Sequence, residues 1–158
     1  MRTTASLLFS LASMALPAAA CSLHQQPLAN SVTPAAEQRP ASGDAPSSTA
    51  KVTVQPLGSV DLSQEFAGLE GRVLRTRRIT IAPGGSVAWH EHQRRPGVAY
   101  ILSGNLIEVR QDGSGQRRIQ RQAGDAVFES SGVRHGWMNN SEQPATAVVI
   151  DLVPASQP

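Results

Sequence analysis

Three of the chain's four histidines stand where they could bind one metal ion together. His90 and His92 lie two residues apart in the segment 86–92, which has the character of a β-strand. Side chains two residues apart on a strand point to the same face, about 6.5–7 Å apart along it. His135 lies in a later segment, and neutral imidazoles are common ligands of divalent transition metals. The pattern predicts a metal site formed by these three side chains.

The elements that must position these histidines are short strands separated by turn residues. Gly, Pro, Asp and Asn interrupt the chain about every 8–12 residues from residue 51 onward. The one segment with helical character, a turn or two long, is 63–69. The predicted strands are 51–56, 72–82, 86–92, 98–102, 105–111, 117–122, 126–129, 136–139 and 145–152. Many short strands with frequent turns are typical of an all-β sandwich or barrel.

The segment around the first two histidines resembles the first sequence motif of the cupin family, whose members are small jelly-roll β-barrels. Gly84 and Gly104 take the two glycine positions that bound this motif. His90 and His92 take its two histidine positions. Gly97 stands where family members have Glu, so the chain departs from the pattern at one position.

A later segment resembles the second cupin motif, in the expected order and at the expected distance from the first. Gly124, Gly132, His135 and Asn139 are in register with it, and Ser130 replaces its Pro. The resemblance covers about residues 70–152. It implies an all-β fold with a single cupin jelly-roll β-barrel.

The resemblance also implies a divalent metal cofactor, because full-motif cupins bind such an ion with three histidines and one glutamate. Fe, Zn, Mn, Ni and Cu all remain candidates. Since Gly97 supplies no carboxylate, we expect weaker binding, and Glu at position 97 should tighten it. A pocket in which the histidines bind no metal is the alternative.

Three functions remain open at this stage, of which the third is a purely structural role through pairing of two barrels. The first is a metal-dependent oxidoreductase acting on a small anionic molecule, since three-histidine cupins include iron dioxygenases that cleave diketones or oxidise thiols. The second is a non-catalytic cupin that binds a small molecule or a metal. The sequence assigns no catalytic residue, and it predicts no pair of carboxylates on an inward strand face.

Further side chains are candidates for the pocket around the histidines. Trp137 is in phase with His135 and is expected to line the pocket. Arg95 follows the first two histidines and suits carboxylate or phosphate capture, although an exposed loop charge is the simpler interpretation. Glu129 could serve as a base near the rim, and Phe128 is expected in the core.

The N-terminal third of the chain has the composition of a signal peptide followed by a flexible linker. Residues 1–20 combine Arg2, an apolar stretch and small residues, as in a signal peptide. Cys21 follows directly, so we expect either lipidation of Cys21 or a soluble periplasmic protein. Residues 21–50 are expected to be a flexible, disordered linker, 51–154 the cupin domain and 155–158 a tail. This organisation predicts a bacterial cell-envelope protein that is periplasmic, with or without a lipid anchor.

Composition limits the partners. The formal net charge is +2 and aromatic residues make up 4% of the chain, so nucleic-acid binding has no support. A single Cys excludes an internal disulfide. The expected partner is a small-molecule ligand or substrate. The resemblance adds that two copies can pair through an edge strand as a homodimer.

Overall fold

The computed structural model describes residues 37–38 and 45–156. The predicted signal peptide (1–20), Cys21, most of the predicted linker and residues 157–158 lie outside the described residues. No helix in the described ranges is long and apolar enough to cross a bilayer. The described residues all belong to the compact unit that follows residue 32.

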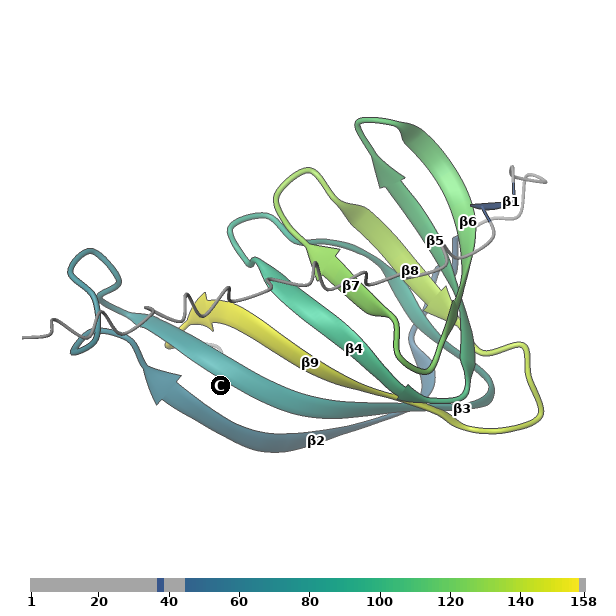
Figure 1. Cartoon of the computed structure of the whole chain (residues 1–158), viewed down its shortest axis with the longest axis horizontal. Helices are drawn as coiled ribbons and strands as arrows, with labels where there is room; N and C mark the ends of the chain where they lie inside the picture. Colours follow the sequence, from purple (N-terminus) through teal and green to yellow (C-terminus); the bar gives the residue numbers. More distant parts are fainter. Residues whose placement is uncertain (1–36, 39–44, 157–158) are drawn as a thin grey trace, which may run out of the picture. The chain divides into compact units, whose positions relative to one another are not determined.

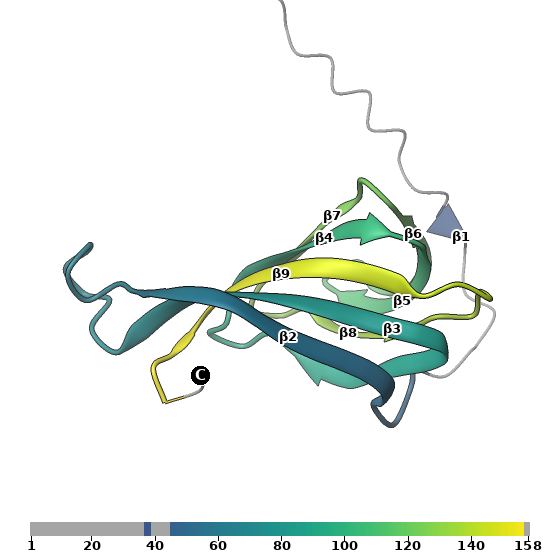
Figure 2. The ribbon, with the colours of Figure 1, turned by 90° about the horizontal axis from the view of Figure 1, so that it is seen from below.

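The described residues form an all-β fold in which every strand pair is antiparallel, as the sequence predicts (Figure 1). The sheet curls into a half-barrel consistent with a cupin jelly roll, a shape that both Figure 1 and Figure 2 show. The strands are β1 (Glu37–Gln38), β2 (Ala50–Asp61), β3 (Arg72–Glu91), β4 (Gly97–Ser103), β5 (Asn105–Asp112), β6 (Gly115–Gln122), β7 (Ala126–Glu129), β8 (Arg134–Met138) and β9 (Ala145–Pro154).

Strand β3 joins the two walls of the curled sheet. Its first part pairs with β2 on one side and β9 on the other, and β4 and β7 extend that wall. Its last part pairs with β8, which continues through β5 and β6 to β1. The same strand therefore carries core residues of one wall and His90 beside the other, and His92 follows directly after its end.

The sequence predicts a break between two strands at 83–85, whereas the structure bends one continuous strand there. Gly84 has a φ of 67°, a left-handed conformation that glycine adopts without strain. At Gly85 a Cβ atom would lie 2.8 Å from the carbonyl oxygen of Ala82. The two glycines thus let β3 change direction, and the predicted turn marks a corner of the barrel.

A β-bulge near the histidines corrects the predicted face of Val87. Simple alternation puts Val87 on the face opposite His90. In the structure Val87 pairs with Trp137 and His90 pairs with His135, so β3 has one more residue than β8 between the paired positions. The extra residue reverses the alternation. Val87 consequently packs against the core on the same side as His90.

The core lies between the two walls and confirms the inward face of β9. Ala145, Ala147, Val149, Asp151 and Val153 alternate inward along this strand. Two other predictions are wrong. Phe128 is 72% exposed, because it alternates with the buried Val127 and Glu129 on β7. Residues 63–69 form turns and no helix, with positive φ at Gly68 and Gly71.

Residues just before position 51 contact the barrel. The amide of Trp89 donates to the carbonyl of Pro46, and the amide of Ala88 donates to the hydroxyl of Thr49. The Ser86 hydroxyl donates to the carbonyl of Ser48. These bonds cover the outer edge of β3 close to the histidines. The ordered part of the domain thus starts ahead of residue 51.

Candidate metal centre

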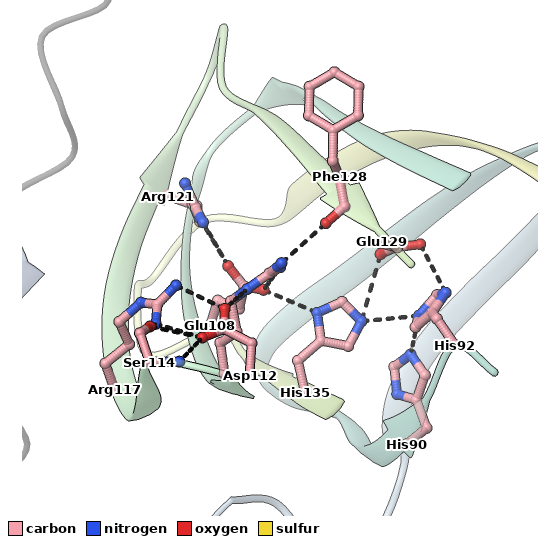
Figure 3. Close-up of polar contacts among 11 residues, drawn as sticks. His90, His92, Glu108, Asp112, Ser114, Arg117, Arg121, Phe128, Glu129 and His135 are labelled. Atoms are coloured by element: carbon pink, nitrogen blue, oxygen red, sulfur yellow. Dashed lines mark hydrogen bonds and ion pairs between the residues drawn. The ribbon is translucent and has the colours of Figure 1, made fainter. Parts of the chain in front are cut away.

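The three predicted histidines come together at one end of the barrel (Figure 3). Nε2 of His92 lies 3.0 Å from Nε2 of His90 and 3.0 Å from Nε2 of His135. His92 is 2% exposed and His135 is fully buried. Two nitrogens that bind one metal ion at about 2.1 Å are about 3.0 Å apart at a right angle and about 3.4 Å apart at the tetrahedral angle of zinc. The spacing of the three Nε2 atoms therefore suits a shared ion.

The partners of the three Nδ1 atoms fix which nitrogen carries the proton. Nδ1 of His90 contacts the carbonyl of Ala88 at 2.8 Å, and Nδ1 of His135 contacts Oε1 of Glu108 at 2.9 Å. Nδ1 of His92 lies 3.3 Å from the carbonyl of Arg95. Each of these partners accepts, so each Nδ1 donates and each Nε2 keeps its lone pair. Three lone pairs pointing at one another repel unless a cation stands between them.

Burial keeps the imidazoles in the neutral form that binds metals. Desolvation, together with the positive charge of nearby groups, lowers the pKa of His90 from 6.5 to about 4. The same causes lower the pKa of His92 to about 3. Both rings are therefore neutral near pH 7, and a metal would meet little competition from protons.

Glu108 on β5 holds His135 in place, and the sequence did not point to it. Besides His135, its carboxylate accepts from Arg110 at 3.1 Å and from Arg121 at 2.7 Å. Burial alone would raise the pKa of Glu108, but the hydrogen bond from His135 and the charge of Arg121 lower it to about 2. A carboxylate behind a metal-binding histidine fixes its tautomer and orientation. The sequence contained one indication of its burial: Glu108 lies two residues from the apolar Leu106, so both side chains share one face of the strand.

Gly97 faces the site, but it has no room for a side chain. It pairs with Glu129 of β7 on one side and Asp151 of β9 on the other. A Cβ at position 97 would lie 2.7 Å from the carbonyl oxygen of Ile150 and 2.9 Å from Cβ of Asp151. Both distances are too short for ordinary contacts, so the expectation that Glu at this position would complete the site does not fit this backbone.

Buried carboxylates do gather on the inner face, contrary to the prediction that no such pair exists. Asp151 is 1% exposed and Glu129 is 4% exposed. Asp151 accepts hydrogen bonds from Arg75 and Arg77 at 2.9–3.2 Å. Glu129 lies beside the histidines, with Oε1 3.4 Å from Nε2 of His135 (Figure 3). Burial raises the pKa of Glu129.

A cavity of about 420 Å³ opens beside the histidines. Its walls are largely apolar and include Val54, Ile79, Ile81, Ile101 and Val149. His90, His92 and Glu129 line it, as do both predicted pocket residues, Trp137 and Arg95. The cavity has the size of a site for one small ligand.

The two predicted pocket residues take different positions around the histidines. The Trp137 ring packs edge-on against His135, with 5.4 Å between centroids. Nη2 of Arg95 lies 3.4 Å from Nε2 of His92. Arg95 forms no ion pair with a carboxylate of the described ranges. Its guanidinium is therefore available to an anion next to the histidines.

The donor set fits a divalent transition metal. Three neutral imidazole nitrogens suit Fe, Zn, Ni and Cu, and the lone pairs need a cation between them. The three ligand atoms lie within 4.8 Å of one another. The fold and site thus define a small all-β domain with a buried three-histidine cluster that could bind one metal ion.

This class of protein has a family name. Residues 77–151 match the family model described as a Cupin domain, so this part of the chain is a cupin domain. No curated protein matches the sequence.

Solved structures similar to this chain also include cupins. A cupin 2 conserved barrel domain protein from Salinispora arenicola is 21% identical, with a TM-score of 0.47 over 63% of this chain and 74% of that one. The Cupin_2 domain of an XRE family transcriptional regulator from Enterobacter cloacae is 17% identical, with a TM-score of 0.48 over 66% and 99%. An oxalate oxidase in complex with the substrate analogue glycolate is 24% identical, with a TM-score of 0.48 over 65% and 54%.

Proposed function

We propose that the chain is a metal-dependent oxidoreductase in which His90, His92 and His135 hold one divalent transition metal beside a cavity for a small anionic molecule. The observation that carries the proposal is the convergence of three Nε2 lone pairs, with Nε2 of His92 3.0 Å from Nε2 of both His90 and His135. Protonation of Nε2 would not relieve their repulsion near neutral pH, because the pKa values of His90 and His92 lie near 4 and 3. A metal ion does relieve it.

The residues around the cavity favour an anion with an apolar part. Arg95 presents a guanidinium to the cavity, and guanidinium groups bind carboxylates through paired hydrogen bonds. The apolar wall, which includes Ile79 and Val149, matches an alkyl or aryl portion and excludes water from the reacting end. A small organic carboxylate meets both demands.

Each protein group has a defined part in this reaction. A bound metal supplies Lewis acidity and, for iron or copper, redox chemistry. Arg95 orients the carboxylate of the substrate. Glu108 accepts the Nδ1 proton of His135 and keeps its Nε2 lone pair directed at the site. Trp137 packs against the His135 ring and limits its rotation.

Elemental analysis of protein prepared without affinity-tag metal tests the proposal. We expect close to one Fe, Zn, Mn, Ni or Cu per chain, lost in a His90→Ala/His92→Ala variant. Protein that contains iron is then assayed for oxygen uptake with short carboxylates. Absence of metal after reconstitution would refute the metal site. Metal without any turnover would favour the non-catalytic binding function.

We also propose that the domain works in the bacterial cell envelope. The support is the signal-peptide character of residues 1–20 and the position of Cys21 directly after them. Palmitate labelling of the full chain and of a Cys21→Ala variant separates the two forms of export. Label that depends on Cys21 indicates a lipid anchor, whereas an unlabelled periplasmic protein indicates ordinary cleavage. Retention of residues 1–20 in the mature protein would contradict export.

A further inference from the structure

We propose that Glu129 of β7 supplies the carboxylate ligand that β4 lacks at Gly97. The metal would then be bound by three nitrogens and one oxygen, with the carboxylate coming from the neighbouring strand. The inference rests on the proposed function, since it concerns the same metal. It names a ligand that the sequence motif does not contain.

Strand register places Glu129 at the position where the carboxylate is missing. Gly97 and Glu129 are direct partners of the antiparallel β4–β7 pair. Paired residues in a sheet point to the same face, with Cβ atoms about 4.5–5.5 Å apart when both have side chains. A glutamate is long enough to bridge that offset. A carboxylate at position 129 therefore lies on the same inner face as one at position 97 would, and at the same level along the two strands.

Of the two carboxylates that flank Gly97, only Glu129 is available to a metal. Asp151, the partner of Gly97 on β9, accepts three hydrogen bonds from Arg75 and Arg77. Its Cβ would lie 2.9 Å from a Cβ at position 97, so it also fills the space that a side chain there would need. Glu129 forms no hydrogen bond or close ion pair with an arginine among the described residues, although the charge of Arg95 acts on it, and it lines the cavity.

The buried carboxylate of Glu129 is incompletely satisfied by hydrogen bonds among the described residues, and a bound cation would satisfy it. Its side chain is 4% exposed, and within the described part of the chain no hydrogen bond reaches its buried Oε2. The nearest ring nitrogens are Nδ1 of His92, 3.3 Å from Oε2, and Nε2 of His135, 3.4 Å from Oε1. Nε2 of His135 carries a lone pair, so it cannot donate to Oε1. A metal between the imidazoles and this carboxylate satisfies both, and the carboxylate lowers the net charge of the three-histidine metal site from +2 to +1.

Zinc affinity of the full chain tests the inference. Metal is removed from the wild type, Glu129→Gln and Glu91→Gln, and Zn²⁺ binding is measured by competition with a chromophoric chelator. We expect Glu129→Gln to bind Zn²⁺ about tenfold or more weakly. Glu91→Gln changes an exposed carboxylate between the two histidines and should bind as the wild type does. Equal affinity of all three proteins would overturn the inference and leave the three-histidine site intact.

Formate provides a second measurement that a purely structural role would not affect. In Glu129→Ala the removed side chain leaves space in which formate can bind the metal. We expect added formate to restore Zn²⁺ affinity in Glu129→Ala and to leave the wild type unchanged. Absence of this rescue would count against Glu129 as a ligand.

Two further outcomes separate the possible failures. Wild-type protein that binds no Zn²⁺ would overturn the proposed function and this inference together. Without metal, Glu129→Gln should melt no lower than the wild type, because it removes a buried carboxylate that lacks a donor. A variant that fails to fold would show that the Glu129 carboxylate is satisfied by the protein, and would overturn the inference.

Discussion

Adding a side chain at Gly97 should destabilise the domain, although the family motif has Glu there. A Cβ at this position would lie 2.7 Å from the carbonyl oxygen of Ile150 and 2.9 Å from Cβ of Asp151, whereas ordinary contacts begin near 3.4 Å. Gly97 is not among the glycines with positive φ, so lack of space alone opposes the change. The atoms in the way belong largely to strand β9, which must move away from β4.

The expected loss of stability depends on whether the new side chain adds only volume or also a charge. Overpacking a buried position typically costs about 1–3 kcal/mol, which is our expectation for Gly97→Ala. Gly97→Glu adds a buried charge beside Glu129 and Asp151, and leaving such a charge without a partner costs about 3–5 kcal/mol more. Urea unfolding followed by tryptophan fluorescence measures both, with constant slopes showing that the unfolded states are comparable.

Metal affinity completes this test. We expect Gly97→Glu to bind Zn²⁺ no more tightly than the wild type, since the new carboxylate displaces β9 before it can reach the histidines. Gly97→Ala separates the effect of space from the effect of charge. Wild-type stability in Gly97→Ala, or tighter Zn²⁺ binding in Gly97→Glu, would refute the reasoning from the contact distances.

Three further predictions concern the histidines and the groups around them. Glu108→Gln should weaken Zn²⁺ binding by about 10–100-fold, since His135 loses its carboxylate partner, and should lower the free energy of unfolding by about 3–5 kcal/mol because Arg121 loses its carboxylate partner and Arg110 keeps only Asp112. Chelator competition and urea unfolding measure the two effects, and an unchanged Zn²⁺ affinity would contradict the role given to Glu108. The metal-free protein should lose stability as pH falls from about 6.5 to about 4, because the unfolded chain binds protons at His90 and His92 that the folded chain excludes. Melting temperatures across this range test the sign. They are measured in the Glu129→Gln variant, because the raised pKa of Glu129 changes the stability of the wild type in the opposite direction. A flat profile would show that the rings titrate normally. Free Zn²⁺ at 100 times its Kd should stabilise the wild type by about 2.7 kcal/mol, with no effect on His90→Ala/His92→Ala, and equal stabilisation of both proteins would place the metal elsewhere.

The sequence located the histidines because their positions depend on local spacing. The spacing predicts that His90 and His92 share a strand face, and the cupin motifs bring His135 next to them. In the structure His92 follows the end of β3, and its Nε2 atom lies 3.0 Å from Nε2 of each of the other two histidines. Local alternation failed at Val87, because a bulge adds a residue that no nearby sequence signal marks. Phe128 was misplaced because an aromatic residue on a short strand does not reveal which face is inward.

The carboxylates could not be predicted because their roles depend on pairing between strands distant in the sequence. Glu108 acts on His135 across the β5–β8 pair, 27 residues away. Glu129 meets Gly97 only through the β4–β7 register. The room at position 97 depends on Ile150 and Asp151 of β9. These pairings become visible only once the strands are assembled into the sheet.

The shared strand β3 has a consequence for how the site opens. Residues 73–81 pair with β2 and with β9, so their amides are enclosed on both sides. His90 follows on the same strand and pairs with His135 of β8. Local unfolding that frees His90 and His135 must break the β3–β8 pairing, next to a stretch of β3 that is paired on both sides. Amide hydrogen exchange should be slowest along β3. Ions and ligands consequently enter and leave through the mouth of the cavity while the backbone remains closed.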